Sequence, residues 1–176
     1  RAERAEERED DEDGEEEAEA AFPYSTASWF FLDAVDMAAP GTKAVVALGD
    51  SITDGTASTM NGDDRWPDVL ARRLLAAGRT DLAVVNAGIG GNQVVGPVGY
   101  DPHKPVPGGP SALHRLERDV LGLSGVGAVI WLEGINDFSK NGGATADAVI
   151  AGMTEGVGRL RAAVPGVRVI GATLTS

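Results

Sequence analysis

The chain has 176 residues, 43% of them hydrophobic, which is enough for one domain with a hydrophobic core. Its net charge of −12 is concentrated at one end, because residues 1–20 hold twelve acidic residues and three arginines and leave only −3 for the rest. This nearly neutral remainder excludes the basic surface of a nucleic-acid-binding domain. No apolar run approaches the roughly 20 residues of a transmembrane helix, and the absence of cysteine excludes disulfides and thiolate metal sites.

The first segment, residues 1–21, consists almost entirely of Glu, Asp, Arg and Ala. Its dense like charges and its lack of an apolar stripe predict a solvated, disordered tail. The alternative is an acidic tail that binds cations or basic partners.

The second segment, residues 22–40, has a different composition. Much of the aromatic content of the chain lies here, at Trp29, Phe30 and Phe31. We expect an extended linker that packs against the domain or forms the end of another one.

From residue 41 onward the pattern alternates between strand and helix. The continuous apolar run Val45–Leu48 predicts a buried parallel strand, and Gly49 lets the backbone turn sharply before Ser51. A serine held at the end of such a strand can be a nucleophile. The alternative is that Asp50, Ser51 and Thr53 only cap a following helix.

The next elements lead to a second loop. Apolar residues at helical spacing predict a helix over 65–77, and 82–85 form a strand that ends at Asn86. The glycine-rich turn 88–91 follows. Residues 96–110 are rich in Pro and Gly, so we predict a long loop of the kind that often contributes to a site.

The last elements lead to a third loop. A helix is predicted around residues 113–120, then a strand over 126–132 that runs into the loop 133–137. The clearest helical stripe follows over 149–164, despite three interior glycines that each cost about 1 kcal/mol relative to alanine. A fourth strand is expected over 167–174.

This alternation predicts an α/β fold with a parallel sheet and helices on both faces. Functional loops of such sheets gather at the carboxyl ends of the strands, where Ser51, the glycine turn and Asn136 are all expected. An ester hydrolase needs a nucleophile and donors for the developing oxyanion, and these residues supply both types of group. The alternatives are that Gly90 and Gly91 serve only for positive φ, and that Asn136 makes an Asx turn.

Three motifs carry a resemblance to a known family: Gly49-Asp50-Ser51-Ile52-Thr53, Asn86-Ala87-Gly88-Ile89-Gly90-Gly91-Asn92 and Gly134-Ile135-Asn136-Asp137. In order and position they resemble the first three sequence blocks of the SGNH hydrolases, or GDSL esterases and lipases. The resemblance covers about residues 43–176. It implies a three-layer α/β/α sandwich with a flavodoxin-like sheet.

The same resemblance implies roles for three residues. Ser51 matches the nucleophile, and Gly91 and Asn136 match two oxyanion donors. The implied reaction is hydrolysis of acyl esters of carbohydrates or lipids through an acyl-enzyme, with no cofactor and no metal. The segment Ser28-Trp29-Phe30-Phe31-Leu32 is similar to what precedes the first block in bacterial, mostly secreted members, so the resemblance suggests secretion.

One family block has no counterpart. Asp-x-x-His, which supplies the general base and its orienting acid, is absent, and the two histidines, His103 and His114, fit surface positions. We therefore expect the chain itself to be weakly active or inactive. We also expect the domain, residues 41–176, to be truncated, with an uncovered sheet edge and apolar surface.

Two other functions compete with the esterase. A non-catalytic carbohydrate-binding module on the same fold would explain the missing base. A nucleotide-binding domain is disfavoured, because Gln93 stands where Gly-x-Gly-x-x-Gly requires its third glycine and no Gly-Lys-Ser/Thr loop exists. The expected partner is a small-molecule or carbohydrate ester, and the sequence predicts no oligomeric state.

Overall fold

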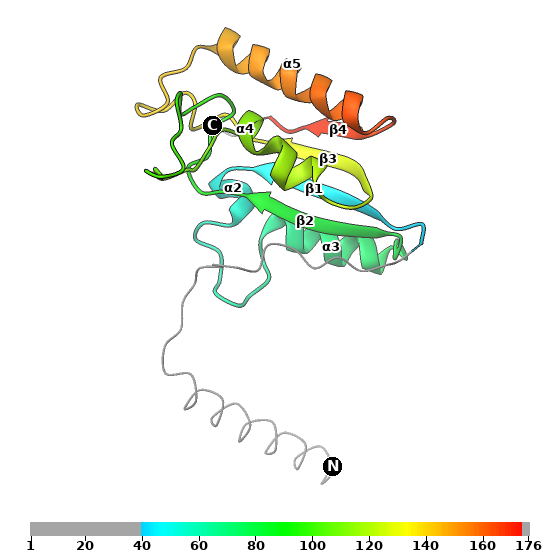
Figure 1. Ribbon diagram of the computed structural model, residues 1–176. Coiled ribbons are helices and arrows are strands. Elements are labelled where there is room, and N and C mark those ends of the chain that lie inside the picture. The colour runs from blue at the N-terminus through cyan, green and yellow to red at the C-terminus, as the bar shows by residue number, and fades with distance from the viewer. Residues whose placement is uncertain (1–39, 174–176) are drawn as a thin grey trace. The chain divides into compact units, whose positions relative to one another are not determined.

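A parallel four-stranded sheet forms the centre of the domain in a computed structural model that describes residues 40–173. The strands are β1 (Lys43–Gly49), β2 (Leu82–Gly88), β3 (Val126–Leu132) and β4 (Arg168–Gly171), in the order β2-β1-β3-β4 (Figure 1). The predicted acidic tail, and all of the aromatic segment except Pro40, lie outside the described residues.

Helices cover both faces of this sheet. They are α2 (Ser51–Asp54), α3 (Trp66–Ala76), α4 (Ala112–Leu116) with a π-helical turn η1 (Glu117–Leu121), and α5 (Ala146–Ala163). From β1 the chain crosses to β2 at one edge of the sheet, and from β2 it crosses back past β1 to β3 and then to β4 at the other edge. Crossovers of the same hand therefore place α3 on one face of the sheet and α4 and α5 on the other face (Figure 1). The predicted α/β/α sandwich is confirmed.

The strand order also locates the place where ligands bind in such sheets. β1 and β3 are neighbours, but the chain leaves them towards opposite edges, which makes the gap between their carboxyl ends a topological switch point. In register, Gly49 pairs with Gly88 on β2 and with Leu132 on β3. The three loops that follow these strands therefore start at one level of the sheet.

The main core lies between the sheet and the α4–α5 layer. Its largest fully apolar members include Leu48 from β1, Val129 from β3, Leu116 from α4 and Leu160 from α5. Trp131 joins this cluster from β3. The stripe predicted for the long helix faces this core.

The strand limits differ from the predicted ones at two places. β2 runs to Gly88 instead of ending at Asn86, because β1 pairs with it to the last residue. β4 covers four residues instead of the eight expected over 167–174, since pairing with β3 ends at Gly171. In the described residues β4 has one neighbour, and its Ile170 is half exposed.

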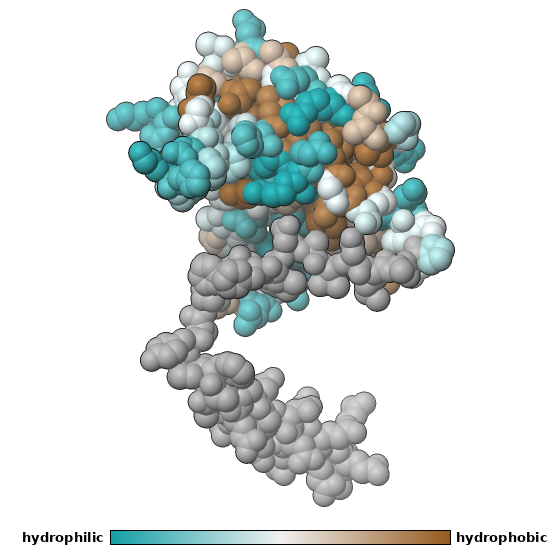
Figure 2. Space-filling view, viewed as in Figure 1, coloured by the Kyte–Doolittle hydropathy of each residue, from teal (hydrophilic) through white to brown (hydrophobic). Residues whose placement is uncertain are grey.

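Hydrophobic side chains are also exposed, alongside polar ones, on the face of the molecule in Figure 2. Within residues 40–173, none of the helices has the length and apolar character needed to span a bilayer.

Candidate active site

Ser51 is the first residue of α2, directly after β1. The turn before it is tight: a Cβ added to Gly49 would lie 2.2 Å from Thr53 Oγ1 and 2.4 Å from the Leu132 carbonyl oxygen. The helix is capped by Asp50, whose Oδ1 accepts a hydrogen bond of 3.0 Å from Ile52 N. The capping interpretation thus holds for Asp50, while the partly exposed Ser51 hydroxyl has no hydrogen bond to another described residue.

The end of β2 is fastened to α2. Asn86 Nδ2 donates to the Thr53 carbonyl at 2.9 Å, and its Oδ1 accepts from Gly88 N at 2.9 Å. Gly88 leaves room for this approach, because a Cβ there would lie 2.2 Å from Asp54 N. The second loop therefore starts beside the short helix that begins with Ser51.

Gly91 lies in this second loop, with a φ of +79° that favours glycine. Gly90 does not share this conformation. The long loop returns to the same place, because a Cβ on Gly108 would lie 2.5 Å from the Gly91 carbonyl oxygen. The need for positive φ therefore explains Gly91 but not Gly90. Gly91 is an exposed residue.

Asn136 joins the third loop to the second. Its Nδ2 donates to the Asn92 carbonyl at 2.9 Å, and within the described residues its Oδ1 accepts no hydrogen bond of the kind that the alternative Asx turn requires. The next residue, Asp137, strengthens the link by accepting from Val94 N at 2.8 Å and Val95 N at 3.0 Å. An amide nitrogen carries two hydrogens, so Asn136 keeps one for a further acceptor.

A buried arginine connects the strand ends below these loops. Arg115 on α4 is 1% exposed, and it donates to the carbonyls of Gly49 at 2.9 Å and Ala87 at 2.7 Å. It also donates to Asn92 Oδ1 at 2.8 Å. Sequence reasoning missed this residue, because an arginine among helical residues is most often solvent-exposed. The one sequence feature that could have identified Arg115 is its position, because it directly precedes Leu116, a member of the predicted apolar stripe.

Arg115 is surrounded by acidic groups. It pairs with Asp119 at 2.9 Å, and its Nη2 lies 3.9 Å from Oε1 of the buried Glu133. The Glu133 Oε2 accepts from Trp131 Nε1 at 2.8 Å, whereas Oε1 has no hydrogen-bond partner. Burial raises the pKa of Glu133 to about 7, against the opposing effect of the Arg115 charge.

Asp50 is a second buried acid at this level of the sheet. Its Oδ2 has no hydrogen-bond partner, and burial raises the pKa of its carboxyl above the usual range. The pKa of Asp50 is raised further by the charge of Asp137, and that of Glu133 by both aspartates. The charge of Asp137 therefore acts on both of the buried acids, Asp50 and Glu133.

Neither histidine is hydrogen-bonded to Ser51 within the described residues. Both His103 and His114 are exposed, and His114 packs edge-on against Tyr100 with 6.3 Å between ring centroids. This agrees with the surface positions expected from the sequence. Among residues 40–173 there is also no group of three or more His, Cys, Asp or Glu side chains placed to hold a metal ion.

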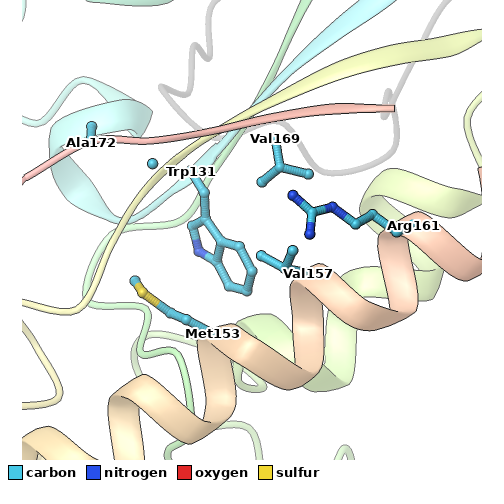
Figure 3. Close-up of a pocket in the computed structure, with 7 residues that line it drawn as sticks. Trp131, Met153, Val157, Arg161, Val169 and Ala172 are labelled. Carbon is cyan, nitrogen blue, oxygen red and sulfur yellow. The ribbon is translucent and has the colours of Figure 1, made fainter. Parts of the chain in front are cut away.

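A cavity of about 190 Å³ lies away from the three loops, between α5 and β4 (Figure 3). Its walls are Trp131, the α5 residues Met153, Val157 and Arg161, and Val169, Gly171 and Ala172 of β4 and its end. The connection to the candidate site is indirect, through the Trp131 indole that donates to Glu133. None of the three predicted site residues lines this cavity.

Comparisons with known proteins give a family and a fold. A family model described as the GDSL-like lipase/acylhydrolase family matches residues 47–176. The esterase AlinE4, described as a member of the SGNH-hydrolase family, is 16% identical over 73% of this chain and 58% of its own, with a TM-score of 0.56. The native aryl esterase of M. smegmatis is 23% identical over 73% of this chain and 63% of its own, with a TM-score of 0.56.

At these identities the structural likeness establishes the fold alone. The chain spans about three-fifths of the length of both esterases. A search of the curated proteins gave no match.

Proposed function

Because the chain belongs to the GDSL-like lipase/acylhydrolase family, we propose that its domain hydrolyses acyl esters with Ser51 as the nucleophile. This proposal rests on the hydrogen bonds that hold three loops together at the topological switch point between β1 and β3. Asn86 links the second loop to α2, Asn136 links the third loop to the second, and Arg115 links the strand ends below them.

In the proposed reaction, Ser51 Oγ attacks the ester carbonyl carbon and the hydroxyl proton passes to a base. The developing oxyanion accepts hydrogen bonds from the backbone N–H groups of Ser51 and Gly91 and from Asn136 Nδ2. The carbonyl then re-forms as the alcohol leaves with a proton. Water hydrolyses the resulting acyl-enzyme, releasing the acid and restoring the serine.

The base is the part of this reaction that the described residues 40–173 do not identify. The two histidines of the chain are exposed and not bonded to Ser51. We therefore propose that this chain alone is weakly active or inactive. Removing a triad member leaves only the acceleration from the oxyanion hole and binding.

Imidazole added from solution tests this proposal, because it can take the place of the missing base. The experiment measures hydrolysis of 4-nitrophenyl acetate by the full chain at pH 7.5 with increasing imidazole. Ser51→Ala, assayed at each imidazole concentration, gives the background, and Ser58→Ala provides a matched control at an exposed serine.

We expect an imidazole-dependent rate that Ser58→Ala keeps and Ser51→Ala lacks. Mass spectrometry of the chain during turnover should find the acetyl group on Ser51. The same rate in the chain and in Ser51→Ala would contradict the nucleophile, and would favour the non-catalytic carbohydrate-binding module instead.

A further inference from the structure

The cavity between α5 and β4 has apolar walls and one charged group. Its volume is about 190 Å³. Its apolar walls include Trp131 of β3, Met153 and Val157 of α5, and Val169 of β4 (Figure 3). Among the described residues that line the cavity, Arg161 of α5 carries the one charge, and its guanidinium points towards the other lining residues (Figure 3).

Gly171 keeps this cavity open on the side of the sheet. In the register of β3 and β4 it is the partner of Trp131, so a side chain at this position would lie beside the indole ring. A Cβ added to Gly171 would have no described heavy atom within 4 Å, apart from its own chain neighbours. The flank of the Trp131 ring is therefore open because the sequence has no side chain here.

The Trp131 ring is held in place from its other sides. Its Nε1 donates to Oε2 of the buried Glu133 at 2.8 Å, and a Cβ added to Gly156 of α5 would lie 2.5 Å from its Cη2. A rotation of the ring into the cavity would break the hydrogen bond to the buried carboxyl group, which costs free energy. The ring is therefore a fixed wall of the cavity.

Arg161 has no hydrogen bond or ion pair with another residue in the described part of the chain. The other arginine of α5, Arg159, has both: it lies 3.9 Å from Glu155 and donates to the Leu113 carbonyl at 2.6 Å. The carboxyl end of a helix favours a cation, which accounts for the charge of Arg161 but not for its direction. A guanidinium can bind a carboxylate through two parallel hydrogen bonds, so Arg161 is suited to an anionic group of a ligand.

The volume of the cavity limits the size of its ligand. An apolar protein cavity of roughly 150 Å³ is large enough to bind benzene. At about 190 Å³, the cavity beside Trp131 accommodates one ring or a short hydrocarbon chain. A long acyl chain does not fit within it.

From these observations we propose that the cavity between α5 and β4 binds a small monocarboxylate whose apolar part is a single ring or a short chain. The apolar part lies against Trp131 and Val157, and the carboxylate pairs with Arg161. Because none of the proposed catalytic groups lines this cavity, the inference does not depend on the proposed function.

An NMR titration of the full chain tests this inference. The chain is labelled with ¹⁵N and titrated with 3-phenylpropanoate and, separately, with 3-phenylpropan-1-ol, which has the same ring and no charge. Arg161→Gln removes the proposed partner of the carboxylate, and Gly171→Leu fills the cavity. The matched controls are Arg168→Gln, at an exposed position of β4, and Gly158→Leu, at an exposed position of α5.

We expect 3-phenylpropanoate to shift the indole N–H signal of Trp131 and not that of Trp66, which donates to Thr53 Oγ1 from α3. It should bind more tightly than the alcohol. Arg161→Gln should weaken binding of the carboxylate about fivefold, the upper range for a solvent-exposed ion pair, and leave binding of the alcohol unchanged. Gly171→Leu should abolish binding of both probes, whereas both controls should bind like the parent chain.

Three results would overturn the inference: an unchanged Trp131 signal up to the solubility limit of 3-phenylpropanoate, equal or tighter binding of the alcohol, or Arg161→Gln that binds the carboxylate like Arg168→Gln. If Gly171→Leu does not fold, Gly171→Ala takes its place, because it adds only a methyl group. Gly171→Ala should weaken binding of both probes, and unchanged affinities would also overturn the inference.

Discussion

Arg115 is the residue on which the ends of β1 and β2 and the second loop depend together. Its guanidinium satisfies the carbonyls of Gly49 and Ala87 and the side chain of Asn92, all in a place from which water is excluded. A buried charge of this kind is stabilising only while its partners stay in place. The same contacts fix the backbone that leads to Ser51.

Arg115→Met is therefore expected to lower the free energy of unfolding by about 3–5 kcal/mol, because it removes the hydrogen bonds to two carbonyls and takes the neighbouring positive charge away from the buried Glu133. Urea denaturation of the full chain measures this loss. Arg73→Met, at an exposed position of α3, should cost less than about 1 kcal/mol. Equal losses of unfolding free energy in the two variants would show that the buried Arg115 contributes no more stability than an exposed arginine.

Glu133 should make stability depend on pH. Burial raises its pKa from 4.5 to about 7 in the folded chain, with Arg115, Asp50 and Asp137 as the charged groups around it. The folded state therefore binds the proton more tightly than the unfolded state. The stabilisation is complete below pH 4.5 and is lost as the pH rises through about 7.

Glu133→Gln removes this titration. The free energy of unfolding of the parent chain, relative to that of Glu133→Gln, is expected to fall between pH 4.5 and about 7. Urea denaturation at several pH values gives this difference. Glu155→Gln, at an exposed position of α5, is the control. The prediction is contradicted if the difference in unfolding free energy between the parent chain and Glu133→Gln changes with pH no more than the difference for Glu155→Gln does.

At the scale of elements, the glycines of α5 have two different roles. Gly152 and Gly156 are buried where the helix meets its neighbours: an added Cβ would lie 2.4 Å from Val95 Cγ1 and 2.5 Å from Trp131 Cη2, respectively. Gly158 has no neighbour within 4 Å of such an atom. Close packing of α5 therefore needs two of the three glycines, Gly156 against Trp131 of β3 and Gly152 against Val95 of the second loop.

The same substitution two residues apart should accordingly have opposite effects. Gly158→Ala is expected to stabilise the chain by about 0.5–1 kcal/mol, from helix propensity alone. Gly156→Ala should destabilise it by about 1–3 kcal/mol, because the methyl group displaces the Trp131 ring. Thermal and urea unfolding of the two variants measure both effects, and stabilisation by Gly156→Ala would contradict the packing.

At the scale of the whole molecule, the sequence predicted the architecture from simple patterns. The continuous apolar runs of β1 and β3 are typical of buried parallel strands, and both strands lie where they were expected. Because parallel strands end at one edge, the positions of Ser51 and Asn136 after these strands could also be predicted.

The remaining features depend on contacts between distant segments. Arg115 resembles any helical surface arginine until Gly49, 66 positions away, is placed beside it. Gly156 is costly for an isolated helix and becomes favourable only against Trp131. The π-helical turn after α4 and the raised pKa of Glu133 likewise arise from packing, which one-dimensional patterns do not contain.

Ser51, Gly91 and Asn136 are proposed to act on a single point, and a structure of a covalent adduct would show whether they do. The full chain is treated with a serine-directed phosphonate in the presence of imidazole, and the adduct is crystallised. We expect phosphorus bonded to Ser51 Oγ, with the phosphoryl oxygen about 3 Å from Ser51 N, Gly91 N and Asn136 Nδ2. A phosphonate on another residue, or a phosphoryl oxygen turned away from the Asn136 amide, would contradict it.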